Sequence, residues 1–526
     1  MYGKNKEDSK YADRWNIVEI IILLAVVCLY IGLTWYGSSG LRGTDDLWYV
    51  ADVESLITGH GAHTNNIFPV SVINGICDLP RPFIHNTLNI YFAAIPSLIF
   101  GAYKGWIVTN IISSLLTSYI IYLIVRDITG HKSAIFAGLT YLIMPLTLLQ
   151  SIKPMAEASI APLAALVLFI YMRIDEKLYK WIVLMIMSGI LAICRLSFLP
   201  VLLVVPFLYL IKIKKINSRV ISGMLLLFFI GAAIIKVNGI LFKPNAAFSY
   251  TQIVNSAVPG KSNNMNLYFD LHPPKITLAE TIENIKLKAI DGFRMQFGDV
   301  KSLYKVKYYL PYNLMFLCGI ILLYKWRDKK CFKISMAALF FYGIHILTII
   351  LFQNQERYML PSLPIMVIAF AVFLGSLNRF ILSKENIISI VLAIMIVVCV
   401  PYNAKWSRQS HVEYWSYIEM YKNLSSSFNS LIPENDTVIV EAMDPWQYLM
   451  HGHFLRPREV LFVPDNYEKK DYDTLVKNVN GKWLICRNNS PILNKMKDKI
   501  KGEFKPLPQP FEYYNIYYLK DGSNTK

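Results

Sequence analysis

Long apolar runs recur along most of this sequence and constrain what it can fold into. A helix that spans the hydrocarbon layer of a membrane needs about 20 consecutive, mostly apolar residues. By this criterion the sequence contains about eleven candidate spans. They are Asn16–Tyr36, Trp106–Ile124, Ser133–Ile152, Ala158–Met172, Trp181–Phe198, Leu199–Ile211, Ile221–Ile235, Tyr309–Tyr324, Ile334–Phe352, Pro361–Leu377 and Ile387–Val400. We therefore predict an all-α, multi-span membrane bundle.

The composition excludes the other broad classes of protein. Hydrophobic residues make up 54% of the chain and charged residues only 17%, whereas a soluble globular protein has roughly 25% charged residues. The mean hydropathy is +0.38, so the soluble globular, disordered and fibrous classes of protein are excluded. The net charge of +17 is explained by basic loops that face the anionic cytoplasmic leaflet. We expect membrane lipids as partners and no nucleic acid.

The distribution of Lys and Arg predicts an orientation. The N-terminal segment is basic, and so are the alternate loops at 126–132, 173–180, 212–219, 325–333 and 379–384. Positive loops remain on the cytoplasmic side. We therefore expect a multi-pass protein of the plasma membrane with a cytoplasmic N-terminus and, with an odd number of spans, an outer C-terminus. This scheme requires that Ile84–Phe100 lies in the outer interface without crossing.

Three large segments are expected outside, and they define the domain organisation. The loops 37–105 and 243–307 belong to a membrane module of residues 1–402, whereas 403–526 form an extracytoplasmic α/β domain. In the second loop, Thr277 to Glu280 has a capping-box pattern, and an apolar stripe behind it predicts a helix on the membrane surface. The stripe consists of Leu278, Ile282, Ile285 and Ala289. The expected strands of the C-terminal domain are Thr437–Val440, Val460–Val463, Trp483–Cys486 and Tyr514–Tyr518.

Two aspartates follow the first span directly. Asp45 and Asp46 come after Thr44, a good N-cap residue, and precede the apolar face of a predicted helix that also carries Tyr49. In one interpretation the two acids only complement the helix dipole. In the other they act at the membrane surface as a general base or as metal ligands.

Four further polar residues stand at the expected outer ends of apolar segments. Arg81 and His85 begin the interfacial segment, Glu157 lies at the end of the third span, and Arg195 lies near the end of the fifth. Either arginine can reach lipid headgroups or bind a phosphate. An ionisable group in an apolar run is a functional hypothesis by default, and the alternative for Arg195 is a structural pair with Glu157. His85 is either a hydrogen-bonded structural residue or a ligand.

Taken in order, these motifs resemble those of the integral-membrane GT-C glycosyltransferases, in particular the protein O-mannosyltransferase and lipid A aminoarabinose transferase superfamily. Residues 45–49 (DDLWY) are similar to that family's D-E-x-x-Y motif after the first span. Residues 81–86 (RPFIHN) resemble its K-P-P-L-H-Y, and residues 356–364 (ERYMLPSLP) resemble its R-Y-x-L-P-x-x-P. Glu157 and Arg195 stand where the family has an acid and a lysine. The chain departs from the pattern in its second Asp and in its two arginines, which replace lysines.

The resemblance implies an inverting glycosyltransferase that moves a hexosyl- or pentosyl-type sugar from a polyprenyl-phosphate donor to a glycan, lipid or protein acceptor on the outer face. Asp45, Asp46 and Glu157 would be catalytic, and the same acids are the candidate ligands if a divalent cation takes part. Arg81, Arg195, His85 and Tyr49 would bind the lipid phosphate. The alternatives are a carrier or flippase for a lipid-linked saccharide, or a polymer ligase. A carrier needs a polar path through the bundle, and most of the spans lack central charges.

Overall fold

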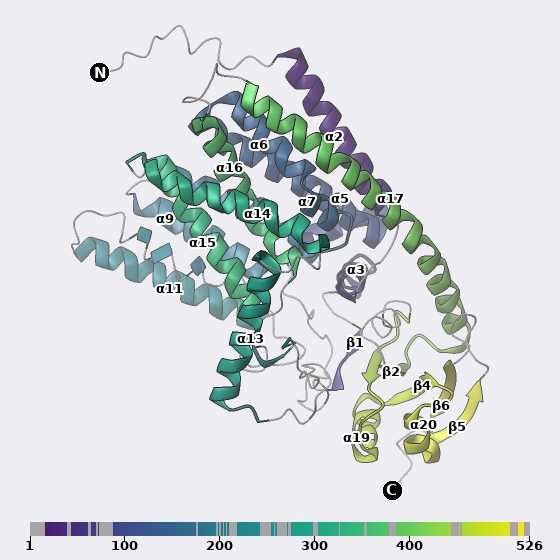
Figure 1. Cartoon of the computed structure of the whole chain (residues 1–526). Helices are drawn as coiled ribbons and strands as arrows, with labels where there is room; N and C mark the ends of the chain where they lie inside the picture. The colour runs from purple at the N-terminus through teal and green to yellow at the C-terminus, as the bar shows by residue number, and fades with distance from the viewer. Residues whose placement is uncertain are drawn as a thin grey trace, which may run out of the picture.

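The computed structural model contains a helical bundle and a smaller α/β unit at one end of it (Figure 1). It describes residues 16–38, 44–61, 65–69, 72, 88–174, 177–195, 198, 201–202, 205–206, 208–209, 218–241, 254–256, 258–259, 271, 275–297, 303–325, 327–351, 355–377, 386–442, 452, 455–504 and 514–519. The helices of the bundle are α2 (Ile17–Gly37), α3 (Thr44–Ile57), α5 (Leu88–Thr129), α6 (His131–Ile143), α7 (Pro145–Ser151), α8 (Ala156–Arg173), α9 (Leu178–Cys194), α11 (Ser218–Leu241), α13 (Leu278–Phe297), α14 (Leu303–Ile321), η2 (Leu322–Lys325), α15 (Lys329–Leu351), η3 (Glu356–Ser362), α16 (Leu363–Leu377) and α17 (Asn386–Leu431).

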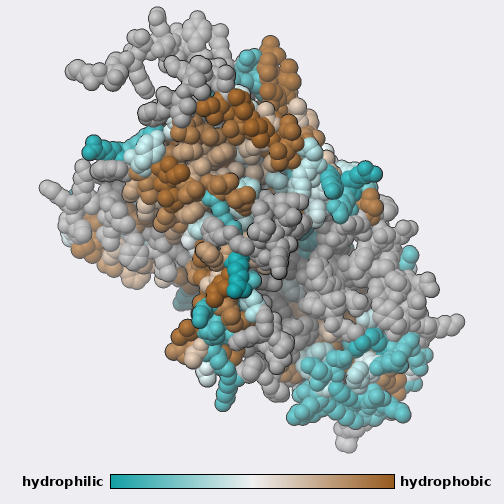
Figure 2. Space-filling model, in the orientation of Figure 1, coloured by the Kyte–Doolittle hydropathy of each residue, from teal (hydrophilic) through white to brown (hydrophobic). Residues whose placement is uncertain are grey.

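The prediction of a multi-span membrane bundle is confirmed. Within the described residues, seven helices are long and apolar enough to cross a membrane, or up to eight if the pair α6 and α7, bent by 51°, forms one span. The apolar helix α9 is shorter. Apolar side chains gather on the surface of the bundle, whereas the C-terminal unit presents a hydrophilic surface (Figure 2). The count of about eleven spans stays a prediction.

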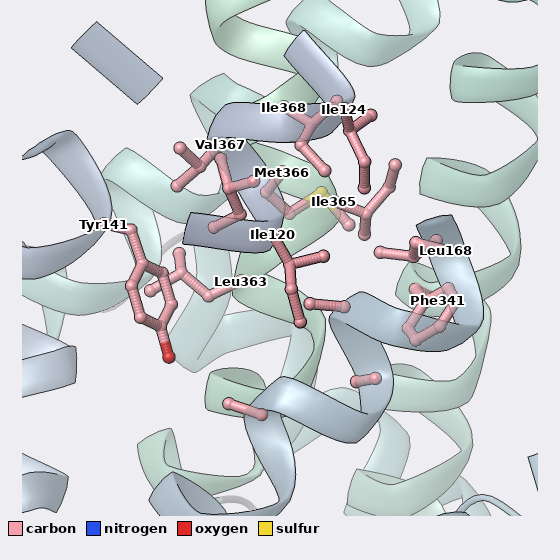
Figure 3. Packing of buried hydrophobic residues seen from close by; sticks show 14 of the residues in the cluster. Ile120, Ile124, Tyr141, Leu168, Phe341, Leu363, Ile365, Met366, Val367 and Ile368 are labelled. Atoms are coloured by element: carbon pink, nitrogen blue, oxygen red, sulfur yellow. The ribbon is translucent and has the colours of Figure 1, made fainter. Parts of the chain in front are cut away.

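The interior of the bundle is filled by aliphatic side chains from helices that are far apart in the sequence. Ile120 and Ile124 of α5 pack in one cluster with Leu168 of α8 and Phe341 of α15. Five residues of α16 contribute to the same cluster: Leu363, Ile365, Met366, Val367 and Ile368 (Figure 3). The candidate span Glu356–Leu377, which consists of η3 and α16, is the most buried of the candidate spans, at 83% of its most apolar stretch. A helix that is apolar on all sides is typical of the centre of a bundle.

One end of the bundle collects basic side chains, and we call it the basic end. Arg173, at the end of α8, donates to Asp127 of α5 at 2.6 Å. Lys333 of α15 donates to the carbonyl oxygens of Tyr171 and Ile174 at 3.1 and 3.0 Å. The loops around 126, 173 and 330, which we predict on the same side of the membrane, therefore meet at the same end. Because Glu157 starts α8 and Arg173 ends it, Glu157 lies at the opposite end.

A sharp bend inside α5 separates its first part from the span. Gly101 has φ of +75° and ψ of 162°, which breaks the helical backbone between residues 88–100 and the remainder. Gly105 follows one turn later, and a Cβ built on it would lie 2.3 Å from Cα of Ser97. The two parts of α5 thus touch through their backbones, which only glycine permits. Segment 88–100 is a separate helix, and Ile95, Leu98 and Ile99 on it are exposed. That Ile84–Phe100 lies in the outer interface without crossing stays a prediction.

The helix expected in the second large loop is present as α13. Its capping box is formed, since Thr277 N donates to Glu280 Oε2 at 2.7 Å and Glu280 N donates to Thr277 Oγ1 at 3.2 Å. Leu278 and Ile282 of the predicted stripe are exposed. The polar residues Asn284, Lys288 and Gln296 are buried instead. Helix α13 therefore presents apolar side chains outward, as a helix in contact with lipid would; its place at the membrane surface stays a prediction.

The C-terminal unit is an α/β structure, as predicted. Its strands are β1 (Asn66–Ile67), β2 (Thr437–Glu441), β3 (Val460–Val463), β4 (Gly481–Arg487), β5 (Ile500–Phe504) and β6 (Tyr514–Leu519), with α19 (Lys469–Val479), α20 (Pro491–Met496) and η4 (Lys497–Lys499). The sheet order is β1-β3-β2-β4-β6-β5. The first four strands are parallel, and β6 pairs antiparallel with β4 and β5. All four predicted strands are present.

Both faces of this sheet are covered. Alternate residues such as Val438 and Phe462 pack with Trp48 and Val50 of α3 on one face. Their neighbours Ile439 and Leu461 pack with Leu475 of α19 and Ile492 of α20 on the other face. The sheet therefore includes β1 and contacts α3, both from the segment 37–105, and α17 runs without a break across residues 402 and 403. The division at residue 402 stays a prediction, and several elements connect the two parts.

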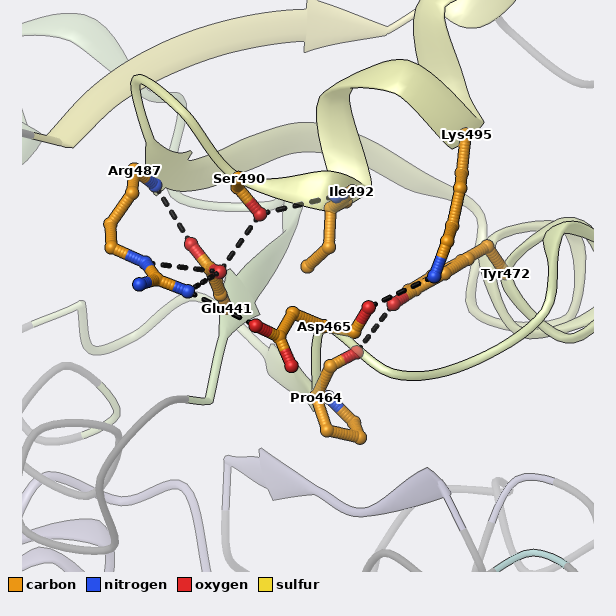
Figure 4. A network of polar contacts seen from close by, with 8 residues as sticks. All are labelled: Glu441, Pro464, Asp465, Tyr472, Arg487, Ser490, Ile492 and Lys495. Atoms are coloured by element: carbon orange, nitrogen blue, oxygen red, sulfur yellow. Dashed lines mark hydrogen bonds and ion pairs between the residues drawn. The ribbon is translucent and has the colours of Figure 1, made fainter.

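A polar network closes the carboxyl ends of β2 and β4 (Figure 4). The buried carboxylate of Glu441 accepts hydrogen bonds from the backbone N and Nη2 of Arg487, both at 2.8 Å. The hydroxyl of Ser490 donates to it at 2.8 Å. Arg487 Nη2 also contacts Asp465 at 3.1 Å. Because the Glu441 carboxylate is fully paired, we assign this network to the stability of the domain.

Candidate functional site

Glu157 is the centre of a buried charge cluster at the end of the bundle where α3 lies. It lies in the first turn of α8, where a negative charge complements the helix dipole. Its side chain is fully buried. Arg195 Nη2 lies 2.8 Å from Glu157 Oε1, and Arg357 Nε lies 3.7 Å from the same oxygen. The predicted pairing of Glu157 with Arg195 is present, with a second arginine added.

The two arginines come from the ends of different elements. Arg195 is the C-cap of α9, and its backbone N–H donates to Leu191 O at 3.0 Å. Arg357 lies in η3, the short helix that precedes α16. Both guanidinium groups lie over the ring of Tyr358, at 4.9 and 5.1 Å from its centroid. We call Glu157, Arg195, Arg357 and Tyr358 the arginine cluster.

The arginine cluster carries a net charge of one positive unit, counted from two arginines and one glutamate. The two arginine side chains are each 18% exposed, whereas Glu157 is 0% exposed. The accessible part of the cluster is therefore its cationic part. A partly desolvated pair of guanidinium groups binds phosphate by charge-assisted, bidentate hydrogen bonds. The arrangement fits an anionic headgroup.

Tyr49 and Trp106 connect α3 to the arginine cluster. Tyr49 is buried and stacks on Trp106, with ring centroids 5.2 Å apart. Trp106 Nε1 in turn donates to the carbonyl oxygen of Met155, two residues before Glu157, at 3.3 Å. The sequence interpretation of Tyr49 as a site residue is consistent with this position.

Of the other predicted site residues, the structure describes the side chain of one. Asp46 is buried on α3, at 2% exposure. Asp45 belongs to the same helix, but its side chain lies outside the described part of the structure. Arg81 and His85 also lie outside the described residues. The roles predicted for these residues stay predictions.

Sequence reasoning missed Arg357 and Tyr358 as site residues. Both lie within the ERYMLPSLP segment that carries part of the resemblance, but no local pattern shows that this segment reaches the start of α8. The sequence feature that could have identified them is an Arg and a Tyr next to an apolar run. An ionisable residue in such a segment costs free energy and usually has a function.

A divalent cation is a candidate cofactor only through the resemblance. Among the residues that the structure describes, no group of three or more His, Cys, Asp or Glu side chains could hold a metal ion. The carboxylate of Glu157 faces two guanidinium groups, whose positive charge opposes a bound cation. Glu157 therefore does not fit a metal ligand. A cation held by Asp45 and Asp46 stays a prediction, and we derive no step through it.

Comparison with solved structures identifies proteins of the same architecture. The structure of ArnT from Cupriavidus metallidurans bound to undecaprenyl phosphate matches with a TM-score of 0.56 at 11% identity, over 95% of this chain and 97% of that chain. The oligosaccharyltransferase of Archaeoglobus fulgidus in its apo form matches with a TM-score of 0.53 at 11% identity, over 89% and 69%. AglB from the same organism, in complex with an inhibitory peptide and a dolichol-phosphate, matches with a TM-score of 0.50 at 12% identity, over 98% and 75%.

No family model matches the sequence, and no curated protein matches it. At these identities the likeness to the solved structures concerns the fold. It extends over nearly the whole chain and includes both the bundle and the C-terminal unit. The fold predicted from the sequence motifs is confirmed: this chain is a multi-pass membrane protein with the GT-C fold of integral-membrane glycosyltransferases.

Proposed function

We propose that the chain is a glycosyltransferase that takes a sugar from a polyprenyl-phosphate donor and transfers it to a glycan, lipid or protein acceptor on the outer face of the membrane. The observation that carries the proposal is the arginine cluster, in which Glu157 holds two partly exposed guanidinium groups at the end of α8 opposite the basic end. The GT-C fold supports it, because ArnT and AglB were solved with undecaprenyl phosphate and a dolichol-phosphate.

The orientation follows from the same placement. If the basic end faces the cytoplasm, as positively charged loops do, then the arginine cluster, α3 and the C-terminal unit face the outside. A polyprenyl phosphate anchored in the bilayer presents its phosphate at headgroup depth, near the end of α8. The isoprenoid chain would stay in lipid while the sugar reaches the aqueous side.

The reaction is a single displacement at the anomeric carbon of the donor sugar. An acceptor oxygen or nitrogen forms the new bond to that carbon, and the carbon–oxygen bond to the phosphate breaks with inversion. The bonding electron pair leaves with the lipid phosphate, whose charge Arg195 and Arg357 stabilise. A carboxylate at the start of α3, Asp45 or Asp46, takes the proton from the acceptor. Glu157 holds the two arginines in place.

Binding of undecaprenyl phosphate to the purified full chain tests the proposal. A hydrogen bond to a charged group contributes about 1.5–3 kcal/mol, so Arg195→Ala and Arg357→Ala should each weaken the affinity by about 10- to 150-fold. Arg173→Ala is the matched control, since Arg173 is an ion-paired arginine at the other end of α8. It should leave the affinity unchanged.

Turnover separates the transferase from the alternatives. With a panel of undecaprenyl-phosphate-linked hexoses and pentoses and an acceptor extract, a transferase releases free undecaprenyl phosphate. Removing the base, by Asp45→Asn or by Asp46→Asn, abolishes the release. A carrier or flippase would bind the same lipids without releasing it. Equal affinities of the wild type and both arginine variants for undecaprenyl phosphate would refute the proposed phosphate site.

A further inference from the structure

Asp52 is a second buried acid on α3, and the proposed chemistry does not use it. It follows Tyr49 by about one helical turn, and its residue is 1% exposed. Trp48, about one turn before it, packs against the sheet of the C-terminal unit. Asp52 therefore lies where α3 passes between the arginine cluster and that unit.

Arg456 is the charged group that acts electrostatically on Asp52, and its neighbour Leu455 packs in the same cluster as Trp48 of α3. Arg456 belongs to the segment that leads into β3, and the Asp52 charge acts on it. Arg456 Nε donates to Asn65 Oδ1 at 3.3 Å. The amide of Asn65 is itself fixed, because its Nδ2 donates to Gly452 O at 2.7 Å and to Arg458 O at 3.0 Å. Asn65 thus holds Arg456 in a defined position.

Both members of this pair have hydrogen-bonding capacity that is not used. Within the described part of the chain, no hydrogen bond reaches the carboxylate of Asp52, and Arg456 Nη2 is buried without a hydrogen-bond partner. Burial raises the pKa of the Asp52 carboxyl well above its usual value, although Arg456 opposes the shift. Buried polar groups in folded proteins nearly always have partners, and the exceptions call for an explanation such as a bound ligand. The structure therefore has a buried hydrogen-bond acceptor on α3 and a buried hydrogen-bond donor on the segment that leads into β3, and, among the described residues, each has an atom without a hydrogen-bond partner.

We propose that Asp52 and Arg456 bind neighbouring hydroxyl groups of a sugar ring, a role that rests on the proposed function. A hydroxyl both donates and accepts, whereas a carboxylate only accepts and a guanidinium only donates. Two adjacent hydroxyls can therefore satisfy both groups at once. A phosphate would be repelled by Asp52, and a simple cation by Arg456. The ring can belong to the donor or to an acceptor glycan, because both present the same chemistry.

The position of α3 agrees with this role. Tyr49 stacks on Trp106, whose Nε1 donates to the carbonyl oxygen of Met155 near Glu157, and Asp52 follows Tyr49 on the same helix. A donor whose phosphate lies at the arginine cluster would carry its sugar toward α3. The C-terminal unit would then complete the sugar site by contributing Arg456.

The experiment compares sugar-bearing with sugar-free ligands on the full chain in nanodiscs. The first panel is undecaprenyl phosphate and its mannose, glucose, galactose, N-acetylglucosamine and arabinose derivatives. The second panel is the methyl glycosides of the same sugars. For the wild type we expect that at least one sugar in one panel adds affinity. Asp52→Asn and Arg456→Gln should each reduce that added affinity by about 10- to 150-fold.

The two panels distinguish the source of the ring. A loss confined to the lipid-linked sugars assigns the site to the donor, and a loss confined to the methyl glycosides assigns it to the acceptor. The affinity of Asp52→Asn and Arg456→Gln for undecaprenyl phosphate itself should stay unchanged. Phosphate binding by the arginine cluster is therefore tested separately from sugar binding. Asp498→Asn is the control, because Asp498 is an exposed acid of the same unit, paired with Lys469 at 3.0 Å.

Two results would overturn the assignment. One is a wild type that gains affinity from no sugar in either panel. The other is Asp52→Asn and Arg456→Gln proteins that remain folded and bind every ligand as the wild type does. Unfolding midpoints of all variants check the fold, and the isosteric Asp52→Asn change keeps the shape of the side chain.

Discussion

Replacing Glu157 by glutamine tests whether this carboxylate holds the arginine cluster together. The change keeps the size of the side chain and removes its charge. With an effective dielectric constant of about 20, Coulomb's law gives a gross attraction of about 6 kcal/mol at the 2.8 Å separation from Arg195. The same law gives about 4–5 kcal/mol at the 3.7 Å separation from Arg357. Much of this attraction offsets the cost of burying the carboxylate.

The net effect is the cost of leaving two guanidinium groups without their counter-charge. Breaking a buried pair by removing one partner typically costs about 3–5 kcal/mol, and we expect a loss of this size in the free energy of unfolding of Glu157→Gln. The cluster then carries one more positive unit. Undecaprenyl phosphate should therefore bind the variant at least as tightly as the wild type and should stabilise it more.

Equilibrium unfolding in mixed micelles, with and without undecaprenyl phosphate, measures both effects. Glu280→Gln is the control, since Glu280 is the exposed capping-box acid of α13 and should contribute about 1 kcal/mol or less. A Glu157→Gln protein as stable as the wild type would refute the structural reasoning. A stability loss together with weaker lipid binding would show instead that the charge of Glu157 is needed to keep the two guanidinium groups in the geometry that binds phosphate.

Three further changes test other parts of the structure. Gly105→Ala places a Cβ 2.3 Å from Cα of Ser97, so it should lower the free energy of unfolding by about 3 kcal/mol or more. The variant should lose the monodisperse peak in size-exclusion chromatography. The control Gly343→Ala, whose Cβ meets nothing within 4 Å, should elute as the wild type does. Asp52 has a raised pKa because of its burial, so the folded chain holds this proton to a higher pH than the unfolded chain does. The free energy of unfolding should then fall as pH rises from about 4 through the raised pKa, and Asp52→Asn should be more stable than the wild type at pH 7 and equal to it near pH 3. Glu441→Gln removes a buried carboxylate that accepts from Arg487 and Ser490, so it should lower the unfolding free energy by about 3 kcal/mol in denaturant titrations, and a loss under 1 kcal/mol would contradict the assigned structural role.

Local patterns predicted the elements that depend on neighbouring residues. Apolar runs located the membrane helices, and short runs rich in β-forming residues located the four strands of residues 437–518, because each signal lies within one element. The capping box of Thr277 and Glu280 forms as its spacing indicates. The Glu157–Arg195 pair was foreseeable because two ionisable groups stood at the same ends of apolar segments.

The contacts that complete the site depend on residues far apart in the chain. Arg357 reaches Glu157 only because η3 packs beside the start of α8. The strand β1 has two residues, too few for a periodic pattern. Asp52 and Arg456 lie on separate elements, and nothing in the sequence around either residue indicates that the other lies near it. The approach of Ser97 to Gly105 was equally invisible, because it depends on the backbone angle at Gly101.

The place of β1 in the sheet has a consequence for the order in which the chain assembles. Asn65, next to β1, is held by Gly452, which lies 387 residues later in the chain. During synthesis this segment leaves the membrane after the first span, yet its partners β2 and β3 are made only after the last span. Trp48 and Phe68, which pack into the same core, therefore lack their packing partners until the C-terminal strands have been synthesised. Long-range pairing of this kind forms late and leaves apolar surface open to misassembly. We expect C-terminal truncations to trap the protein in the membrane with this loop unfolded, where it would be open to proteases and chaperones on that side.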